Sequence, residues 1–421
     1  MSEPRADRTG YLASRRDVAL LCGAAFALNF GAGHWWVALP FIVKRLGGSD
    51  TMVGTCLAVH MGAYALTILA AGPLLYRFNA KRVVQAGVGC TVAFTGAMCG
   101  LVGASWAGWR VPHAIGMLTG LTAVLGMSLA AFWPPLLGWL SAGSEGGVLS
   151  RRLGLFSLWV SIGTLLSPYP GGVLVEAATV LPVAAAVVIQ VGCLALASLA
   201  ANPGGAGAAE GAARPWSAGP GARGSSVPDR FRWLARVALY AVFVSVGLSR
   251  TQAPLLLKLE LGYSESTYGV FLTATFLAST LVYWLAGRTQ YWHHRLWLFL
   301  AAQGLVLAFG VVMLAARELP LLLTGSVALG LGGAFTYNSH LYYGVSGGGR
   351  RSAGMAIHEF TLAAGYCTGG VAGGWLSDAF GRRAPYWLGA GVLIGALIVE
   401  AVLWRRSRGA LPPGAPAPGG R

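Results

Sequence analysis

Residues 153–175, LGLFSLWVSIGTLLSPYPGGVLV, form a run of 23 residues without a single Asp, Glu, Lys or Arg. About 20 apolar residues are enough for a helix to cross the ~30 Å hydrocarbon core of a bilayer, so this run predicts a membrane-spanning helix. Eight further charge-free runs of similar or greater length occur at 18–43, 51–76, 83–109, 111–144, 177–209, 266–287, 296–316 and 319–349. The chain therefore predicts a polytopic membrane protein.

The overall composition supports the same class. Of the 421 residues, 55% are hydrophobic and only 10% are charged, with a mean hydropathy of +0.63. A soluble domain carries roughly 25% charged residues, and a disordered chain is more polar still, so both classes are excluded. The net charge of +16 does not indicate a nucleic-acid partner, because the basic residues lie between long apolar runs instead of clustering on a folded face.

Three more spans each contain a charge: 233–257 with Arg250, 352–377 with Glu359, and 384–404 with Glu400. The fold class expected is all-α, with twelve transmembrane helices in two pseudo-symmetric halves of six. The predicted segments are an N-terminal tail (1–17), a first half (18–199), a Gly-, Ala- and Pro-rich flexible linker (200–232), a second half (233–404) and a C-terminal tail (405–421).

The loops orient the spans. Of the 30 Lys and Arg residues, 22 fall on the side of the two termini, seven on the other side, and Arg250 lies within a span. Because basic loops stay in the cytoplasm, both termini are predicted to be cytoplasmic. We expect an integral protein of a prokaryotic plasma membrane, monomeric, with membrane lipid as a partner.

The loop between the second and third spans carries a basic motif, GPLLYRFNAKR at residues 72–82. Gly72 permits close helix approach, and Arg77, Lys81 and Arg82 hold the helix ends at the cytoplasmic face.

Spans five and eleven share a pattern of small residues at a constant offset of 202 positions. Small residues form a groove for a neighbouring helix, and Pro168 introduces a bend. The pattern predicts that the two spans are counterparts in two similar halves, as in many transporters. Its members are Gly154, Gly163, Ser167, Pro168, Gly171 and Gly172 in span five and Ala356, Gly365, Gly369, Gly370, Gly373 and Gly374 in span eleven.

Together, twelve spans, the basic loop and the paired glycine pattern resemble the major facilitator superfamily over residues 18–404. The loop is similar to the family signature G-x-L-x-D-R-x-G-R-K-R, with Tyr76 in place of its Asp and Asn79 in place of its Gly. In the family that Asp is thought to help lock the halves on the cytoplasmic side, so here the lock is absent or made differently. Span five resembles the signature G-x8-G-x3-G-P-x2-G-G of exporters that exchange substrate for protons, with Ser167 replacing one Gly.

The resemblance implies a secondary transporter that moves a small molecule by alternating access. No cofactor is expected, and a proton gradient is the expected driving force. The resemblance favours efflux over uptake. Two other functions stay open: a transporter-like receptor or assembly factor that moves nothing, and an uncoupled uptake facilitator. An apolar, neutral or anionic substrate fits best, because the first six spans contain no interior carboxylate.

Polar groups inside spans are costly and are candidates for function. In the first half these are Asn29, His34 and His60. Both histidines fall near the outer third of their spans, where they could form a titratable pair facing the external vestibule. The alternative is that each is hydrogen-bonded at a helix contact.

Arg250 is the single basic residue predicted inside a span, and Pro254 after it marks a helix break. Arg250 could bind an anionic substrate or a carboxylate, or it could extend to the outer interface.

Glu359, with His358 beside it, is the candidate for proton coupling, because a carboxyl group buried about two turns inside the membrane is costly to ionise. A structural role at the cytoplasmic gate is the alternative. Tyr337 and Asn338, in a polar-aromatic cluster that continues to His340, fall at similar depth and are cavity candidates.

No other chemistry is indicated. The six cysteines fall inside predicted spans without metal-ligand spacing, so no metal site is expected. No pairing of a nucleophile with a base stands out from what chance spacing of these residue types would give, so we expect no enzymatic activity. Glu400 is predicted to extend to the inner surface. Asp378, Arg382 and Arg383 are predicted to stabilise the last outer turn.

Overall fold

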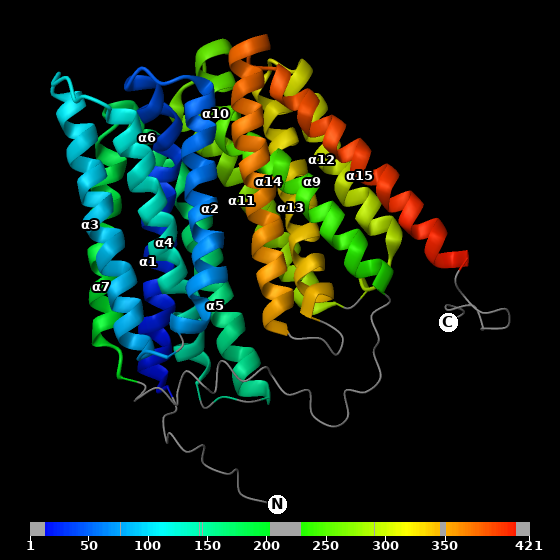
Figure 1. Ribbon diagram of the computed structural model, residues 1–421, viewed down its shortest axis with the longest axis horizontal. Helices are drawn as coiled ribbons and strands as arrows, with labels where there is room; N and C mark the ends of the chain where they lie inside the picture. The colour runs from blue at the N-terminus through cyan, green and yellow to red at the C-terminus, as the bar shows by residue number, and fades with distance from the viewer. Residues whose placement is uncertain are drawn as a thin grey trace, which may run out of the picture.

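The computed structural model describes residues 13–75, 77–142, 144, 146–202, 229–289, 291–345 and 351–409. Within these ranges the ordered elements are helices, which run roughly parallel in two groups (Figure 1). They are α1 (Arg15–Arg45), α2 (Asp50–Leu75), α3 (Ala80–Trp106), α4 (Ala114–Ser141), α5 (Gly146–Leu166), α6 (Pro168–Ala177), α7 (Leu181–Leu199), α9 (Asp229–Thr251), α10 (Ala253–Leu255), a π-helix (Leu256–Glu260), α11 (Glu265–Arg288), α12 (Leu296–Ala315), α13 (Leu319–Val345), α14 (Arg351–Phe380) and α15 (Ala384–Gly409).

The predicted all-α fold of two six-helix halves is confirmed. In the first half α5 and α6 together form one span, and in the second half α9, α10 and the π-helix do so. Among the described residues, eleven spans are long and apolar enough to cross a membrane, and α14, which packs between α2 and α9, is added to them as the remaining span, the eleventh in chain order. We call the face of the bundle that holds Ala13 and Asn202 the terminal face, and the other the opposite face (bottom and top of Figure 1).

The ends of the bundle differ slightly from the predicted boundaries. α1 begins at Arg15 because the Ser14 hydroxyl accepts a hydrogen bond from the Asp17 backbone while the Asp17 side chain bonds the Ser14 backbone. α15 continues to Gly409. Tyr76, most of the predicted linker and most of both tails lie outside the described residues.

The two halves repeat the same internal packing, as the glycine pattern predicted. A Cβ added to Gly163 would lie 2.7 Å from the carbonyl oxygen of Phe26 in α1. The counterpart, Gly365, faces the carbonyl oxygen of Tyr240 in α9 at 2.8 Å. Phe26 and Tyr240 are 214 positions apart, so α1 and α9 are equivalent, just as α5 with α6 is equivalent to α14.

Both halves also contain a helix break at a proline. α5 ends at Leu166 before Pro168, as the sequence predicted. After α9, Pro254 in α10 has no N–H group to bond the carbonyl of Arg250 four residues earlier. The Tyr268 hydroxyl donates hydrogen bonds to the carbonyls of Ser249 (3.2 Å) and Arg250 (3.3 Å), which stabilises the break.

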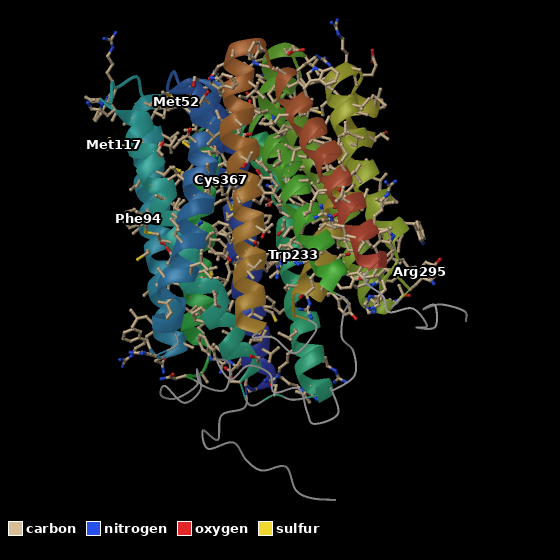
Figure 2. The ribbon with its side chains drawn as sticks, turned by 45° about the vertical axis from the view of Figure 1, so that its right-hand side comes forward. Met52, Phe94, Met117, Trp233, Arg295 and Cys367 are labelled. Atoms are coloured by element: carbon tan, nitrogen blue, oxygen red, sulfur yellow. The ribbon has the colours of Figure 1, made fainter. Side chains whose placement is uncertain are left out.

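The halves meet where α2 packs on α14 and where α6 packs on α11. Gly54 of α2 lies directly against Gly370 of α14, so close that neither position has room for a Cβ. Further along, the Cys367 thiol donates to the carbonyl of Ala58 at 3.3 Å, and Figure 2 shows Cys367 between the two helices. This seam is tightly closed toward the opposite face.

Toward the terminal face the same seam parts. Leu69, fifteen residues after Gly54, lies within about 60° of the same face of α2, and its side chain is 45% exposed. On α14, Phe360 lies two turns before Cys367 and is 54% exposed. The halves therefore separate on the side of the termini.

Candidate functional site

Arg250 lies about halfway through the bundle. Its guanidinium carbon sits 4.7 Å above the ring of Phe276, the twelfth of the 24 residues of α11. It also interacts with the hydroxyl of Tyr366, at the midpoint of α14. The side chain is half-buried at this depth and does not extend to the outer interface.

Within the described ranges, the ion pairs involve Lys44, Lys258, Arg382 and Arg383, and none reaches Arg250. A cation removed from bulk water without a counter-ion is costly. The guanidinium of Arg250 is therefore open to a negatively charged group.

Aromatic rings extend from Arg250 toward the terminal face. The ring of Tyr366 lies 5.3 Å from Phe243, which lies 6.2 Å from Tyr337, which in turn lies 6.0 Å from Tyr283. Tyr283, at the end of the row, is 37% exposed, whereas Phe243 is buried. This row gives the site an apolar wall with phenol hydroxyls.

Glu359 lies on the seam between the halves. It is the ninth residue of α14, about 12 Å from the start of that helix. Its carboxyl interacts with the hydroxyl of Tyr64 across the seam, in α2. Both side chains are half-buried, at the point where the closed part of the seam gives way to its open part.

His358 forms a buried pair with His340. Their Nδ1 atoms are 2.8 Å apart, and both residues are 1% exposed. One imidazole must donate its N–H to the lone pair of the other. The Nε2 atom of His358 has no hydrogen-bond partner among the described residues, and its ring packs 4.7 Å from Tyr337.

The candidates in the first half each bond a backbone carbonyl. The Nδ1 of His34 lies 2.6 Å from the carbonyl of Phe30, and the Nδ1 of His60 lies 2.9 Å from that of Thr122. The Asn29 amide donates to the carbonyl of the residue four before it. No described hydrogen bond or ring contact joins the two histidines: His34 bonds within α1, and His60 bonds across to α4.

A side pocket of about 540 Å³ opens between α11 and α13. Asn338 lines this pocket, whereas Tyr337 belongs to the row of rings. Tyr283 belongs to both. At the far end of the pocket, outside the spans, burial lowers the pKa of His293, with a further contribution from His294. The pocket is lined by Tyr283, Ala286, Gly287, Arg288, Thr289, Trp292, His293, Asn338, Leu341 and Tyr342.

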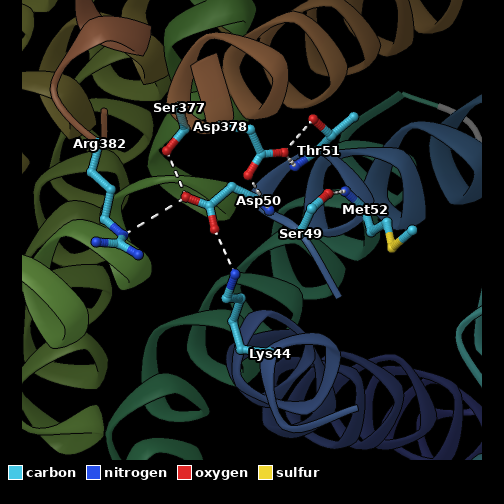
Figure 3. Close-up of polar contacts among 8 residues, drawn as sticks. All are labelled: Lys44, Ser49, Asp50, Thr51, Met52, Ser377, Asp378 and Arg382. Carbon is cyan, nitrogen blue, oxygen red and sulfur yellow. Dashed lines mark hydrogen bonds and ion pairs between the residues drawn. The ribbon is translucent and has the colours of Figure 1, made fainter. Parts of the chain in front are cut away.

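A polar cluster closes the opposite face (Figure 3). The carboxylate of Asp378, in α14, accepts hydrogen bonds from the backbone of Asp50 and Thr51 at 2.9 Å each, and from the Thr51 hydroxyl at 2.6 Å. It therefore caps the N-terminus of α2 from the other half of the molecule. Asp50 in turn pairs with Lys44 at 2.8 Å.

The other seam repeats this arrangement. Glu176, which is 202 positions before Asp378, accepts a hydrogen bond at 2.9 Å from the backbone of Ser266 at the N-terminus of α11. Glu265 pairs with Lys258 at 3.0 Å, as Asp50 does with Lys44. We call Glu176 and Asp378 the two cross-caps. The sequence did not indicate this capping role, although the offset between the two residues equals that of the glycine pattern.

Two sequence interpretations near the helix ends are wrong. Asp378 reaches the other half instead of its own turn, and Arg383 bonds the carbonyls of Leu314 (2.7 Å) and Ala316 (3.0 Å) at the end of α12. Glu400 does not extend to the surface: it is 1% exposed and accepts hydrogen bonds from the Gln303 amide at 3.0 and 2.8 Å.

The basic motif acts within the first half. Lys81 donates hydrogen bonds to the carbonyls of Ser198 (2.8 Å) and Ala200 (2.6 Å), which holds the end of α7. The backbone of Arg82 is capped by Asn79, and Arg77 is exposed.

Comparison with known proteins gives a consistent result. The family model described as Major Facilitator Superfamily matches residues 21–343 and 240–420. No curated protein matches the sequence.

Solved transporters share the fold. The nucleoside transporter NupG is 12% identical with a TM-score of 0.67, covering 92% of this chain and 99% of its own. A POT family transporter in complex with 5-aminolevulinic acid is 13% identical with a TM-score of 0.70, covering 96% and 98%. A bacterial homologue of the human lysosomal transporter Spinster, in an inward-facing and occupied conformation, is 15% identical with a TM-score of 0.66, also covering 96% and 98%.

Proposed function

This chain belongs to the major facilitator superfamily, and from that premise we propose that it is a proton-coupled secondary transporter, which moves a small molecule across the membrane by alternating access. One observation carries the proposal. The two halves are sealed at the opposite face and separate at the terminal face, Glu359 lies on the seam between them, and Arg250 lies about halfway through the second half.

Coupling is assigned to Glu359. A charge on a carboxyl group is costly where the seam excludes water, so closing the seam around Glu359 favours its neutral form. When α2 and α14 separate, water reaches the carboxyl group and the proton can leave. The contact with Tyr64 crosses this seam, which links protonation to the movement of the halves.

The orientation follows from the basic loops, which place the terminal face in the cytoplasm. The site in this structure then faces inward. The resemblance of span five to proton-exchanging exporters places export ahead of uptake. The expected location is a prokaryotic plasma membrane, and a monomer suffices because the site forms within one chain.

The test uses purified protein in liposomes that contain a pH-sensitive dye. A panel of aromatic acids, amines and sugars is added with and without an imposed pH gradient. We compare Glu359→Gln with Glu400→Gln, a matched control, because both remove a buried carboxyl but Glu400 lies away from the seam, paired with Gln303.

We expect Glu359→Gln to abolish flux driven by the pH gradient, while exchange of substrate for substrate continues. Glu400→Gln should retain both activities. If Glu359→Gln kept full gradient-driven flux, the assignment of proton coupling would be wrong. If no compound of the panel moved through the wild-type protein, the transport function itself would be contradicted.

A further inference from the structure

The backbone of Arg250 is held at a helix break. Arg250 is the second-last residue of α9, directly before the break at Gln252 and Pro254. Its backbone carbonyl is held by the hydroxyl of the buried Tyr268. Broken helices of this kind mark binding sites near the middle of transporters.

Neither half supplies a counter-ion. The equivalence of α1 and α9, 214 positions apart, places Trp36 where Arg250 stands, and Trp36 packs on the ring of His60 at 4.7 Å. The interiors of the first six spans contain no Asp or Glu. In the second half, the described carboxyl groups inside spans are Glu359, which interacts with Tyr64, and Glu400, which bonds Gln303.

The surroundings of Arg250 select for more than charge. Phe276 and Tyr366 flank the guanidinium, and Phe243 continues the apolar wall at 5.3 Å from Tyr366. Aromatic rings bind flat apolar groups through offset stacking and edge contacts. A guanidinium binds carboxylates through two parallel hydrogen bonds, and one guanidinium neutralises one negative charge.

We propose that the substrate is an organic monoanion with an aromatic or extended apolar body, whose carboxylate or similar group binds Arg250. The inference rests on the proposed transport function and names the chemical class of its substrate. The body of the ligand lies along Phe276, Tyr366 and Phe243. Inorganic anions fit this site less well because they have no apolar body to contact the rings. Dianions fit less well because the site has a single cation.

The test measures binding by calorimetry and thermal shift on purified wild-type protein. The probes are benzoate and 2-naphthoate, each with its neutral primary amide as a matched compound, and acetate as an anion without a body. The variants are Arg250→Gln and Arg250→Lys. Arg295→Gln is the control, because Arg295 is exposed at the terminal face and stacks on Tyr291 at 3.9 Å without reaching the site (Figure 2).

We expect the acids to bind wild-type protein about 10- to 100-fold more tightly than their amides, and 2-naphthoate more tightly than acetate. Arg250→Gln should lower the affinity for the acids to that for the amides. Arg250→Lys should restore only part of it, because an ammonium lacks the planar fork of a guanidinium. Arg295→Gln should change nothing.

Equal binding of acids and amides, unchanged binding of the acids by Arg250→Gln, or no binding of any acid would overturn the inference. Unchanged binding of the amides to Arg250→Gln shows that this variant is folded. Proton-coupled flux of a neutral or cationic compound would overturn the substrate class and leave the transport function standing. Acid binding that depends on Arg250, without flux of any compound, would support the ligand class and contradict the transport function.

Discussion

His340 and His358 show how much a single hydrogen bond can matter when both partners are buried. Replacing either residue by Leu leaves the other imidazole without its partner, which is expected to cost about 1–3 kcal/mol. The double variant removes both polar groups and should cost less than the sum of the single variants. The measurement is a double-mutant cycle from unfolding in detergent.

The control for this cycle pairs His358→Leu with His60→Leu, whose rings share no described contact. Their effects should add to within about 0.5 kcal/mol. If the His340 and His358 effects also added without coupling, the hydrogen bond would contribute nothing to stability.

At this scale the sequence predicted Arg250 and Glu359 as candidates because a charge inside a membrane span is rare and costly. It did not predict their partners. His340 joined the candidates only through its contact with His358, which depends on how α13 and α14 are rotated and shifted relative to each other. For His34 and His60, spacing along separate helices could not decide whether the rings face each other.

Among the elements, the seam between α2 and α14 depends on glycine. A methyl group at Gly54 would collide with the backbone of Gly370, and backbone cannot move aside as a flexible side chain can. We expect Gly54→Ala to destabilise the closed seam by about 1–3 kcal/mol and to lower the melting temperature.

Gly96→Ala in α3 is the matched control. A Cβ there meets no atom within 4 Å, so the variant should be neutral or gain up to about 1 kcal/mol from helix propensity. A melting temperature for Gly54→Ala equal to or above that of Gly96→Ala would contradict the role of the seam.

The helices themselves were largely predictable. Charge-free length located the spans, and Pro168 and Pro254 located the two breaks. The constant offset of 202 positions predicted that α14 is the counterpart of α5 with α6. What the pattern could not give is which glycine faces which neighbour: Gly365 packs inside its own half, whereas Gly370 packs on the other half.

At the scale of the whole molecule, the sequence predicts the two six-helix halves, but it does not predict which face of the molecule is closed. Basic loops predict which face is cytoplasmic, yet they carry no information on which face is sealed. The seal depends on contacts between residues far apart in the sequence, 327 positions for Thr51 with Asp378 and 90 for Glu176 with Ser266, which only the assembled halves create. An alternating transporter must also break these contacts, so their free energy has to be small.

The cross-caps should therefore set the balance between the two conformations. Each of Glu176 and Asp378 accepts backbone hydrogen bonds at the start of a helix in the opposite half, and losing such a cap costs typically about 1 kcal/mol, roughly fivefold in an equilibrium. Replacing both by Ala should raise the population open at the opposite face by on the order of 20- to 30-fold. Spin labels at Arg110 and Arg317, in loops of the two halves at that face, would report a longer distance between them. The control is Glu318→Ala, because Glu318 is exposed at the same face, and it should leave the distance between the labels unchanged. If the double variant also left this distance unchanged, the glycine seams alone would hold the face closed.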